Sequence, residues 1–66
     1  MPDEDDIRQA AAEHVRMLGS RAGDWLEEQA EIADALEDRQ AAKAWRDIAD
    51  AAKLILLRVR RYHHGR

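Results

Sequence analysis

The chain contains no cysteine, and this absence removes two ways of stabilising a small domain. Disulfide bonds and thiolate metal sites both need cysteine side chains. A chain of 66 residues buries only about 60% of the surface that its unfolded state exposes, so it is marginally stable by itself. Oligomerisation is another common way to stabilise such a chain. We therefore expect a homo-oligomer, in the simplest case a dimer.

Proline, glycine and aromatic residues are scarce as well. The one proline is Pro2, glycine occurs three times, phenylalanine is absent and alanine is abundant. This composition favours helix throughout and leaves no β-rich segment. The predicted fold class is all-α.

Long apolar runs are also missing. The longest run covers residues 54–57, far short of the roughly 20 residues that a membrane-spanning helix needs. The acidic N-terminal end, residues 1–6, lacks the apolar stretch of a secretion signal. We therefore expect a cytoplasmic protein with no membrane contact.

Charge is divided unequally along the chain, although the formal net charge is only -3. Residues 1–38 carry three arginines against twelve acids, and residues 39–66 carry eight basic residues against two acids. The basic C-terminal tail, residues 58–66, complements the dipole of a helix that ends there. The alternative is contact of this tail with nucleic acid or an acidic partner.

Apolar spacing predicts a small three-helix domain that comprises residues 1–66, with helices over about residues 3–18, 21–37 and 39–62. Asp3 and Asp38 are placed to cap the first and third helices. Gly19 is placed to close the first helix in the left-handed conformation, ahead of a connection that ends near Asp24. The short break before the third helix predicts that helices two and three form an antiparallel hairpin.

The third predicted helix is the longest and carries an apolar seam at alternating steps of four and three residues. This seam comprises Ala41, Trp45, Ile48, Ala52, Ile55, Val59 and Tyr62. In the second helix the residues expected to face inward are Ala22, Trp25, Leu26, Ala33 and Leu36, with Ile32 at the edge. We expect Trp25, Trp45 and Ile48 to anchor the core, because the large indole side chains bring most apolar area to a domain otherwise lined with alanine.

Two surfaces of this arrangement are candidates for function. Helix two presents an acidic ridge, which is either a solvated face or a surface for a basic partner. The ridge comprises Asp24, Glu27, Glu28, Glu31 and Asp34. In helix three, Leu54 and Leu57 fall outside the seam, beside Arg58 and Arg61, so we expect both leucines to be exposed. A leucine pair near a helix end is either a harmless patch or a contact surface, and we expect a contact surface.

Catalytic patterns are nearly absent. Ser20 and Tyr62 are the only hydroxyl side chains, and no spacing arranges a triad or a paired-carboxylate site. His14 lies on the apolar face of the first helix, where it is either a satisfied core histidine or a pH-sensitive contact. We expect no catalytic residue, no cofactor and no metal.

One family resemblance is visible in the apolar positions. It is carried by Gly19, Trp25-Leu26, Leu36 to Asp38 and Trp45-Arg46-Asp47-Ile48. The chain resembles small, uncharacterised helical proteins of alphaproteobacteria that are grouped only as a domain of unknown function. Their pattern has a Gly-Asp turn where this chain has Glu37-Asp38. The resemblance covers most of residues 7–57 and implies a bacterial, cytoplasmic origin without an activity or a cofactor.

Three functional hypotheses follow. The first is a non-enzymatic interaction protein that self-associates or docks on a protein partner through the C-terminal half of helix three. The second is nucleic-acid binding through the basic face and tail of that helix, although the sequence pI of about 5.5 is low for such a protein. The third is an acidic nucleic-acid mimic that uses the ridge of helix two.

Overall fold

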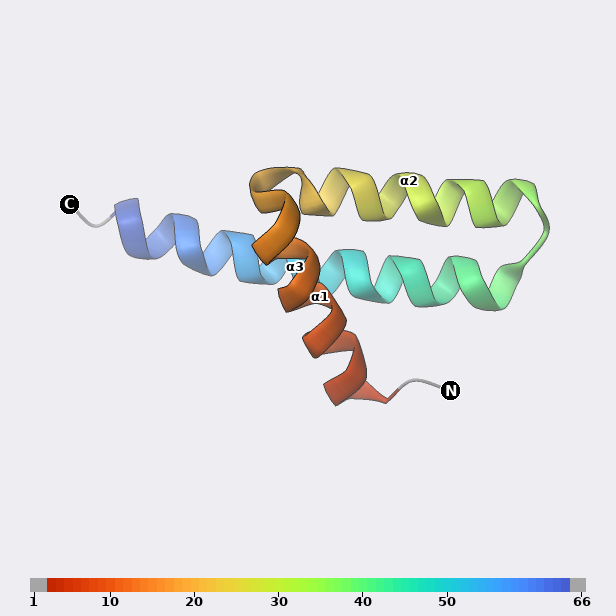
Figure 1. Ribbon diagram of the computed structural model, residues 1–66, viewed down its shortest axis with the longest axis horizontal. Helices are drawn as coiled ribbons and strands as arrows, with labels where there is room; N and C mark the ends of the chain where they lie inside the picture. The colour runs from red at the N-terminus through yellow and green to blue at the C-terminus, as the bar shows by residue number, and fades with distance from the viewer. Residues whose placement is uncertain (1–2, 65–66) are drawn as a thin grey trace.

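The computed structural model describes residues 3–64, with side chains as far as Val59. Helix α1 (Glu4–Leu18) is followed by the 3-10 turn η1 (Gly19–Arg21), helix α2 (Ala22–Ala35) and helix α3 (Arg39–His64). The molecule is elongated, with extents of 45 × 22 × 16 Å. Figure 1 shows α2 and α3 side by side, with α1 crossing α3 obliquely. Over residues 3–64 the regular structure is all helical, as predicted.

The predicted three-helix domain is wrong, because α1 and α2 are not separate helices joined by a loop. Residues 4–35 are helical without interruption, since η1 follows α1 directly and passes directly into α2. The N–H of Gly19 still donates to the carbonyl of Val15, as in a continuing helix. The protein is therefore a helical hairpin, in which a long bent N-terminal helix packs against α3.

The bend lies where a flexible connection ending near Asp24 was expected. Helix α2 begins directly after η1, and neither of them has a side-chain cap at its start. Gly23 is buried inside α2, not part of a turn. A Cβ atom at position 23 would lie 3.2 Å from Cγ of Lys53, so the glycine allows α2 and α3 to approach closely.

The start of α1 is stabilised as predicted. The backbone N–H of Asp6 donates to Oδ1 of Asp3 at 3.2 Å, so Asp3 is the N-cap. The acidic residues of the first turn lie at the positive end of the helix dipole. Arg8 adds an ion pair to Glu4, one turn earlier. Local sequence therefore accounts for where this helix begins.

The turn between α2 and α3 is closed by backbone hydrogen bonds. The N–H of Asp38 donates to the carbonyl of Ala33, and the N–H of Glu37 donates to that of Asp34, both at 2.9 Å. These two bonds form a Schellman motif, which ends a helix and reverses the chain. Oδ1 of Asp38 then accepts from the N–H of Ala41 at 3.1 Å, so the predicted cap of the third helix is present. The predicted antiparallel hairpin of the last two helices is confirmed.

The core of the hairpin is made largely of alanine. Leu26 is the only large side chain that is fully buried among the described residues. The other buried apolar residues are Ala11, Ala22, Ala30, Ala33, Ala42, Ala49 and Ala52. Small side chains allow the helix backbones to approach closely, and both α1 and α2 pack mainly on α3.

Candidate interaction surface on helix α3

Helix α3 is longer than its partner in the hairpin. It has 26 residues against the 14 of α2. Because Gly23, the second residue of α2, already lies against Lys53, most of α3 beyond Lys53 extends past the start of α2. Figure 1 shows the C-terminal part of α3 projecting past the rest of the molecule. We call residues 54–64 the overhang.

The overhang begins with four apolar residues that together cover the circumference of the helix. At about 100° per residue, Leu54, Ile55, Leu56 and Leu57 point to four different sides. Ile55 and Leu56 are half-buried on the side of α1 and the bend. Leu54 is 62% exposed and Leu57 is 56% exposed. The predicted exposure of this leucine pair is confirmed.

Val59 was expected to lie in the buried seam, but it is 46% exposed. Its position follows the pattern of the seam, yet neither α1 nor α2 extends far enough to cover it. The buried residues of α3 are Ala42, Ala49 and Ala52, of which the predicted seam contained only Ala52. The seam residues Trp45, Ile48 and Ile55 are half-buried. The side chain of Tyr62 lies outside the described residues.

An open groove lies on each side of the overhang. Leu54 borders a groove of about 410 Å³ between α3 and α1, which is also lined by Arg8 and Arg58. Leu57 borders a second groove of about 700 Å³ between α3 and the bend, which is also lined by Val59. Arg58 is exposed and, together with Leu54, lines the groove beside α1. The side chain of Arg61, the fourth residue of the predicted surface, lies outside the described residues.

The acidic ridge of α2 is partly neutralised within the chain. Glu27 forms an ion pair with Lys53 of α3, and Asp34 forms one with Arg46 of α3. All four side chains remain about half exposed, so each pair contributes only about 0–1 kcal/mol. These pairs nevertheless join the acidic and basic halves of the chain inside one molecule.

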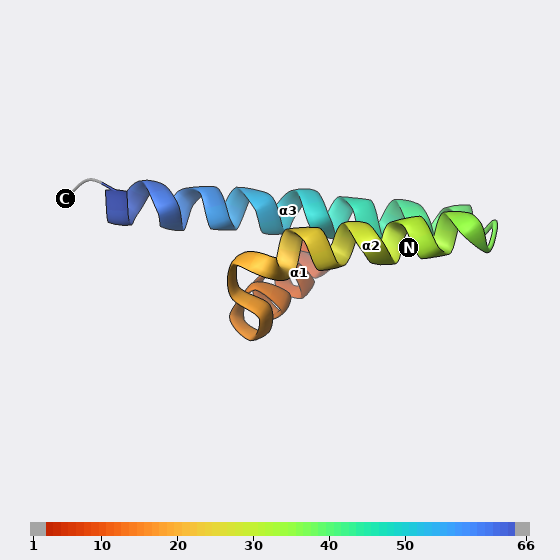
Figure 2. The ribbon, with the colours of Figure 1, turned by 90° about the horizontal axis from the view of Figure 1, so that it is seen from above.

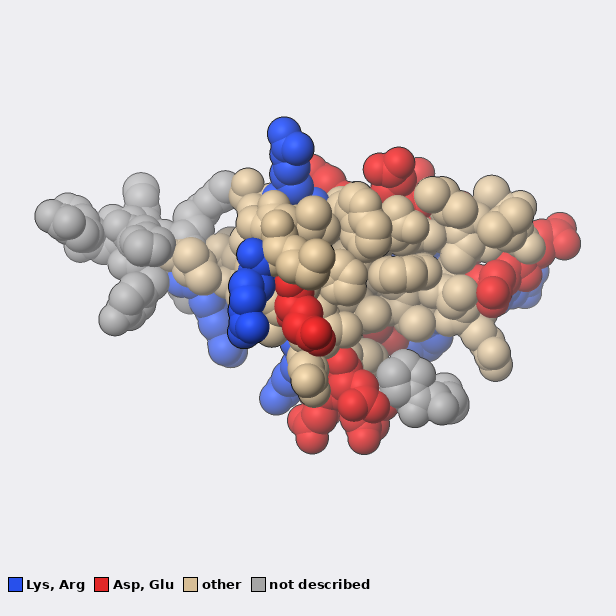
Figure 3. Space-filling model, in the orientation of Figure 1, with Lys and Arg blue, Asp and Glu red and all other residues tan. Residues whose placement is uncertain are grey.

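The remaining ridge residues, Asp24, Glu28 and Glu31, are exposed and have no ion pair among the described residues. Figure 3 shows acidic side chains in separate places on the face in view, at the start of α1, along α2 and near the turn. The ridge is therefore a broken line of negative charge and not a continuous one.

The three residues predicted to anchor the core lie at its edge instead. Trp45 and Ile48 are half-buried against the core, and Trp25 is 37% exposed. Alanine-to-alanine packing brings α2 and α3 too close for an indole ring to fit between them. The tryptophans therefore lie where α1 meets the hairpin.

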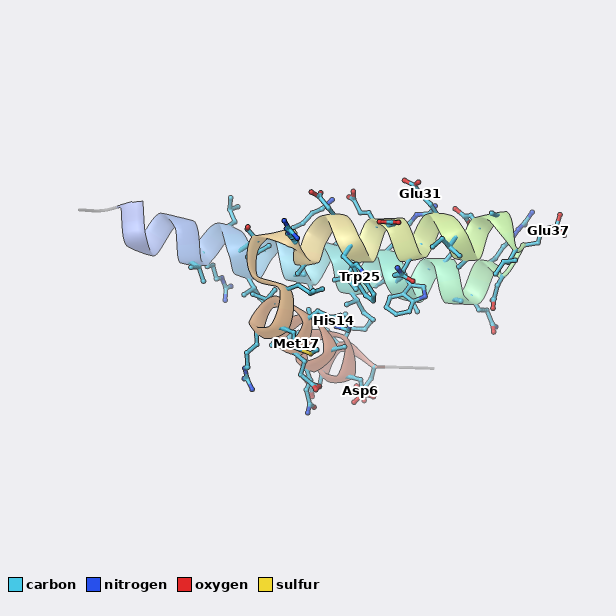
Figure 4. All side chains as sticks on the ribbon, turned by 45° about the horizontal axis from the view of Figure 1, so that its top comes forward. Asp6, His14, Met17, Trp25, Glu31 and Glu37 are labelled. Carbon is cyan, nitrogen blue, oxygen red and sulfur yellow. The ribbon has the colours of Figure 1, made fainter. Side chains whose placement is uncertain are left out.

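At that place the two tryptophans form a cluster with His14. The His14 ring stacks on Trp25, with ring centroids 5.4 Å apart, and Trp45 meets both rings edge-on. Nδ1 of His14 donates to the carbonyl of Ala10 at 2.7 Å. Figure 4 shows His14 and Trp25 in the angle between α1 and α2. Because α1, α2 and α3 each contribute one ring, the cluster holds α1 against the hairpin. This position agrees with the interpretation of His14 as a satisfied boundary residue.

Sequence reasoning missed a second apolar strip, on α2. Ile32 is 48% exposed and Leu36 is 75% exposed, although both were expected to face or border the core. Steps of seven and four residues place Trp25, Ile32 and Leu36 on one line of the helix. The strip stays open because α1 turns away from the far end of the hairpin, as Figure 1 shows.

Among residues 3–59, whose side chains are described, no group of three histidine or acidic residues gathers as metal ligands. None of the described helices combines the length and the apolar character that crossing a membrane requires. Compared with protein-family models, with curated proteins and with solved structures, the chain matches none. The resemblance to the alphaproteobacterial helical proteins therefore stays a prediction.

Proposed function

We propose that the protein is a small, non-enzymatic interaction protein that self-associates through the C-terminal half of α3. The observation that carries this proposal is the apolar surface of the overhang. Leu54, Leu57 and Val59 are each about half exposed on a helix end that extends past the start of α2. A helix that is apolar on all sides is normally buried against another element.

The expected affinity is modest. Full burial of a leucine contributes about 1.5–3 kcal/mol, so the exposed halves of Leu54 and Leu57 in two copies contribute roughly 4–7 kcal/mol in total. A micromolar Kd corresponds to about 8 kcal/mol, and association also has an entropic cost. The contribution of the leucines lies below that value, so we expect a weak dimer with a Kd of roughly tens to hundreds of micromolar.

The small alanine core gives self-association a second basis. The core of a domain of this size supplies only about 3–5 kcal/mol of folding stability, and dimerisation is one common way to increase it. Because the chain has no cysteine, no disulfide bond can supply further stability. The lack of cysteine also agrees with a cytoplasmic location, which we propose for this protein.

Size-exclusion chromatography with light scattering, over a concentration series, tests self-association. We expect the wild-type protein to pass from monomer to dimer, and Leu57→Asp to remain monomeric at all concentrations. Leu36→Asp is the matched control, because it places the same charge on a still more exposed leucine, at the C-cap of α2, and should leave the dimer intact. Circular dichroism of both variants checks that the helices are retained. A wild-type protein that stays monomeric at several hundred micromolar would contradict the proposal.

The two other hypotheses have less support. Both need charged residues that are free for a partner, yet Arg46 and Lys53 pair with acids of α2, and Lys43 pairs with Asp47. A mobility-shift assay at low salt tests nucleic-acid binding directly, because contacts with phosphates weaken steeply as salt rises.

A further inference from the structure

One side of α3 faces away from both α1 and α2. Figure 2 shows this side bare along the length of the helix. Asp50, Leu54 and Leu57 are exposed and follow one another at steps of four and three residues, so they lie on one line of α3 along that side, and Asp50 also borders a groove lined by Glu27 and Glu31 of α2. Arg61 follows Leu57 by four further residues and is still within α3, so position 61 continues the line. We call these four positions the outer stripe.

The order of the outer stripe is acid, leucine, leucine, arginine. The step from Asp50 to Leu54 equals the step from Leu57 to Arg61. If a second α3 runs antiparallel to the first, with Leu54 opposite the second copy's Leu57, then Asp50 comes to lie opposite the second copy's Arg61. The two-fold symmetry of such a dimer repeats each pair.

A parallel arrangement has the opposite electrostatic result. It places Asp50 against Asp50 and Arg61 against Arg61, and like charges at an interface disfavour it. Asp50 has no ion pair among the described residues, so its carboxylate is not committed within its own chain. Resting on the proposed self-association, we propose that a second copy of this chain docks antiparallel on the outer stripe, with the leucines in the middle and an Asp50–Arg61 pair at each end.

The surroundings of the outer stripe suit this orientation. The antiparallel register also brings Lys53 opposite the second copy's Arg58, but the charge of Lys53 is already paired with Glu27. Leu54 and Leu57 border different grooves, of about 410 Å³ and about 700 Å³, which leave space beside the stripe for side chains of the second copy. From position 50 to position 61 the contact is about 16 Å long, at 1.5 Å per residue. The leucines provide the apolar contact, and the charged residues favour the antiparallel orientation of the two helices over the parallel one.

Disulfide cross-linking tests the orientation, because the chain has no cysteine of its own. Asp50→Cys and Arg61→Cys are prepared as two single variants. Each variant alone, and a mixture of the two, is then oxidised at a concentration where the protein is dimeric. In the antiparallel dimer only the mixture cross-links, and mass spectrometry shows a heterodimer with one chain of each kind. Each variant alone stays uncross-linked, because the two copies of position 50, like those of position 61, are about 16 Å apart along the helix axis. Met17→Cys mixed with Arg61→Cys is the matched control and should give no cross-link, because Met17 is exposed on α1, away from the outer stripe.

Charge exchange gives an independent measurement. Asp50→Arg should weaken the dimer roughly tenfold, because it sets two like-charge pairs at the interface. The double variant Asp50→Arg/Arg61→Asp should return the Kd to within about twofold of the wild-type value, since the pairs are restored in reverse.

The two proposals fail in different ways. The antiparallel docking is overturned, while self-association stands, if Asp50→Cys alone forms a cross-linked dimer. It is likewise overturned if the double variant dimerises no more tightly than Asp50→Arg. A wild-type protein that forms no dimer in light scattering overturns both.

Discussion

At the scale of single residues, Glu37 has an unusual backbone conformation. Its φ of 61° lies in the left-handed region, and it is the only residue other than glycine with positive φ among the described residues. It occupies the position of the Schellman motif where glycine is most common, because a Cβ atom is crowded there. Glu37 therefore stores strain at the tip of the hairpin.

We predict that Glu37→Gly stabilises the protein by about 1 kcal/mol, because removing the Cβ atom relieves that strain. For a domain of this size, 1 kcal/mol corresponds to about 4–8 °C in Tm, which a thermal melt followed by circular dichroism detects. Glu31→Gly is the control, since Glu31 lies in the interior of α2, where glycine should cost about 1 kcal/mol. If both variants were destabilised equally, the turn would not be strained.

At the scale of helices, the bend at Gly19 decides how the N-terminal arm packs. Gly19 has φ of 62° and ψ of -136°, a combination that is essentially restricted to glycine. The bend lets α1 cross α3 and bring His14 onto Trp25, instead of continuing straight past the hairpin. The charge and cap signals at the ends of α1 could be predicted from sequence, because they act within a few residues.

We predict that Gly19→Ala destabilises the protein by about 1–3 kcal/mol, because the Cβ atom is strained in this conformation even though no neighbour would contact it. Chemical denaturation measures the change. Ser20→Ala, at the next position, should stay within about 0.5 kcal/mol of the wild type. If both variants were equally stable, the bend would not depend on glycine.

At the scale of the whole molecule, the division of charge is used in two ways. Part of it closes the hairpin, through the pairs of Lys53 and Arg46 with acids of α2. We propose that Asp50 and the overhang provide the contact with a second copy. A monomer of this shape buries little apolar surface beyond its alanines, so the dimer should be more stable than the monomer.

We predict that the Tm of the wild-type protein rises with protein concentration, because association stabilises the folded state by mass action. Each tenfold increase above Kd adds at most about 1.4 kcal/mol. Differential scanning calorimetry over two decades of concentration measures this rise, and Leu57→Asp should show a constant Tm. A wild-type Tm that does not depend on concentration would count against dimerisation.

Several features were predictable from the sequence because they depend on local physical chemistry. The composition determines the all-α class, Asp3 and Asp38 determine where two helices begin, and the spacing of Leu54 and Leu57 determines that they cannot join the seam. Each of these signals acts within one or two helical turns.

Only the tertiary structure decided the rest. The sequence pattern of Gly19 to Asp24 is the same for a loop and for a sharp bend in one helix, and the packing of α1 on α3 selects the bend. Alanine packing decided that the tryptophans lie at the edge of the core, since close backbones leave no space for an indole. The lengths of α2 and α3 decided which apolar residues stay exposed, because burial depends on which helix lies opposite and not on the residue alone.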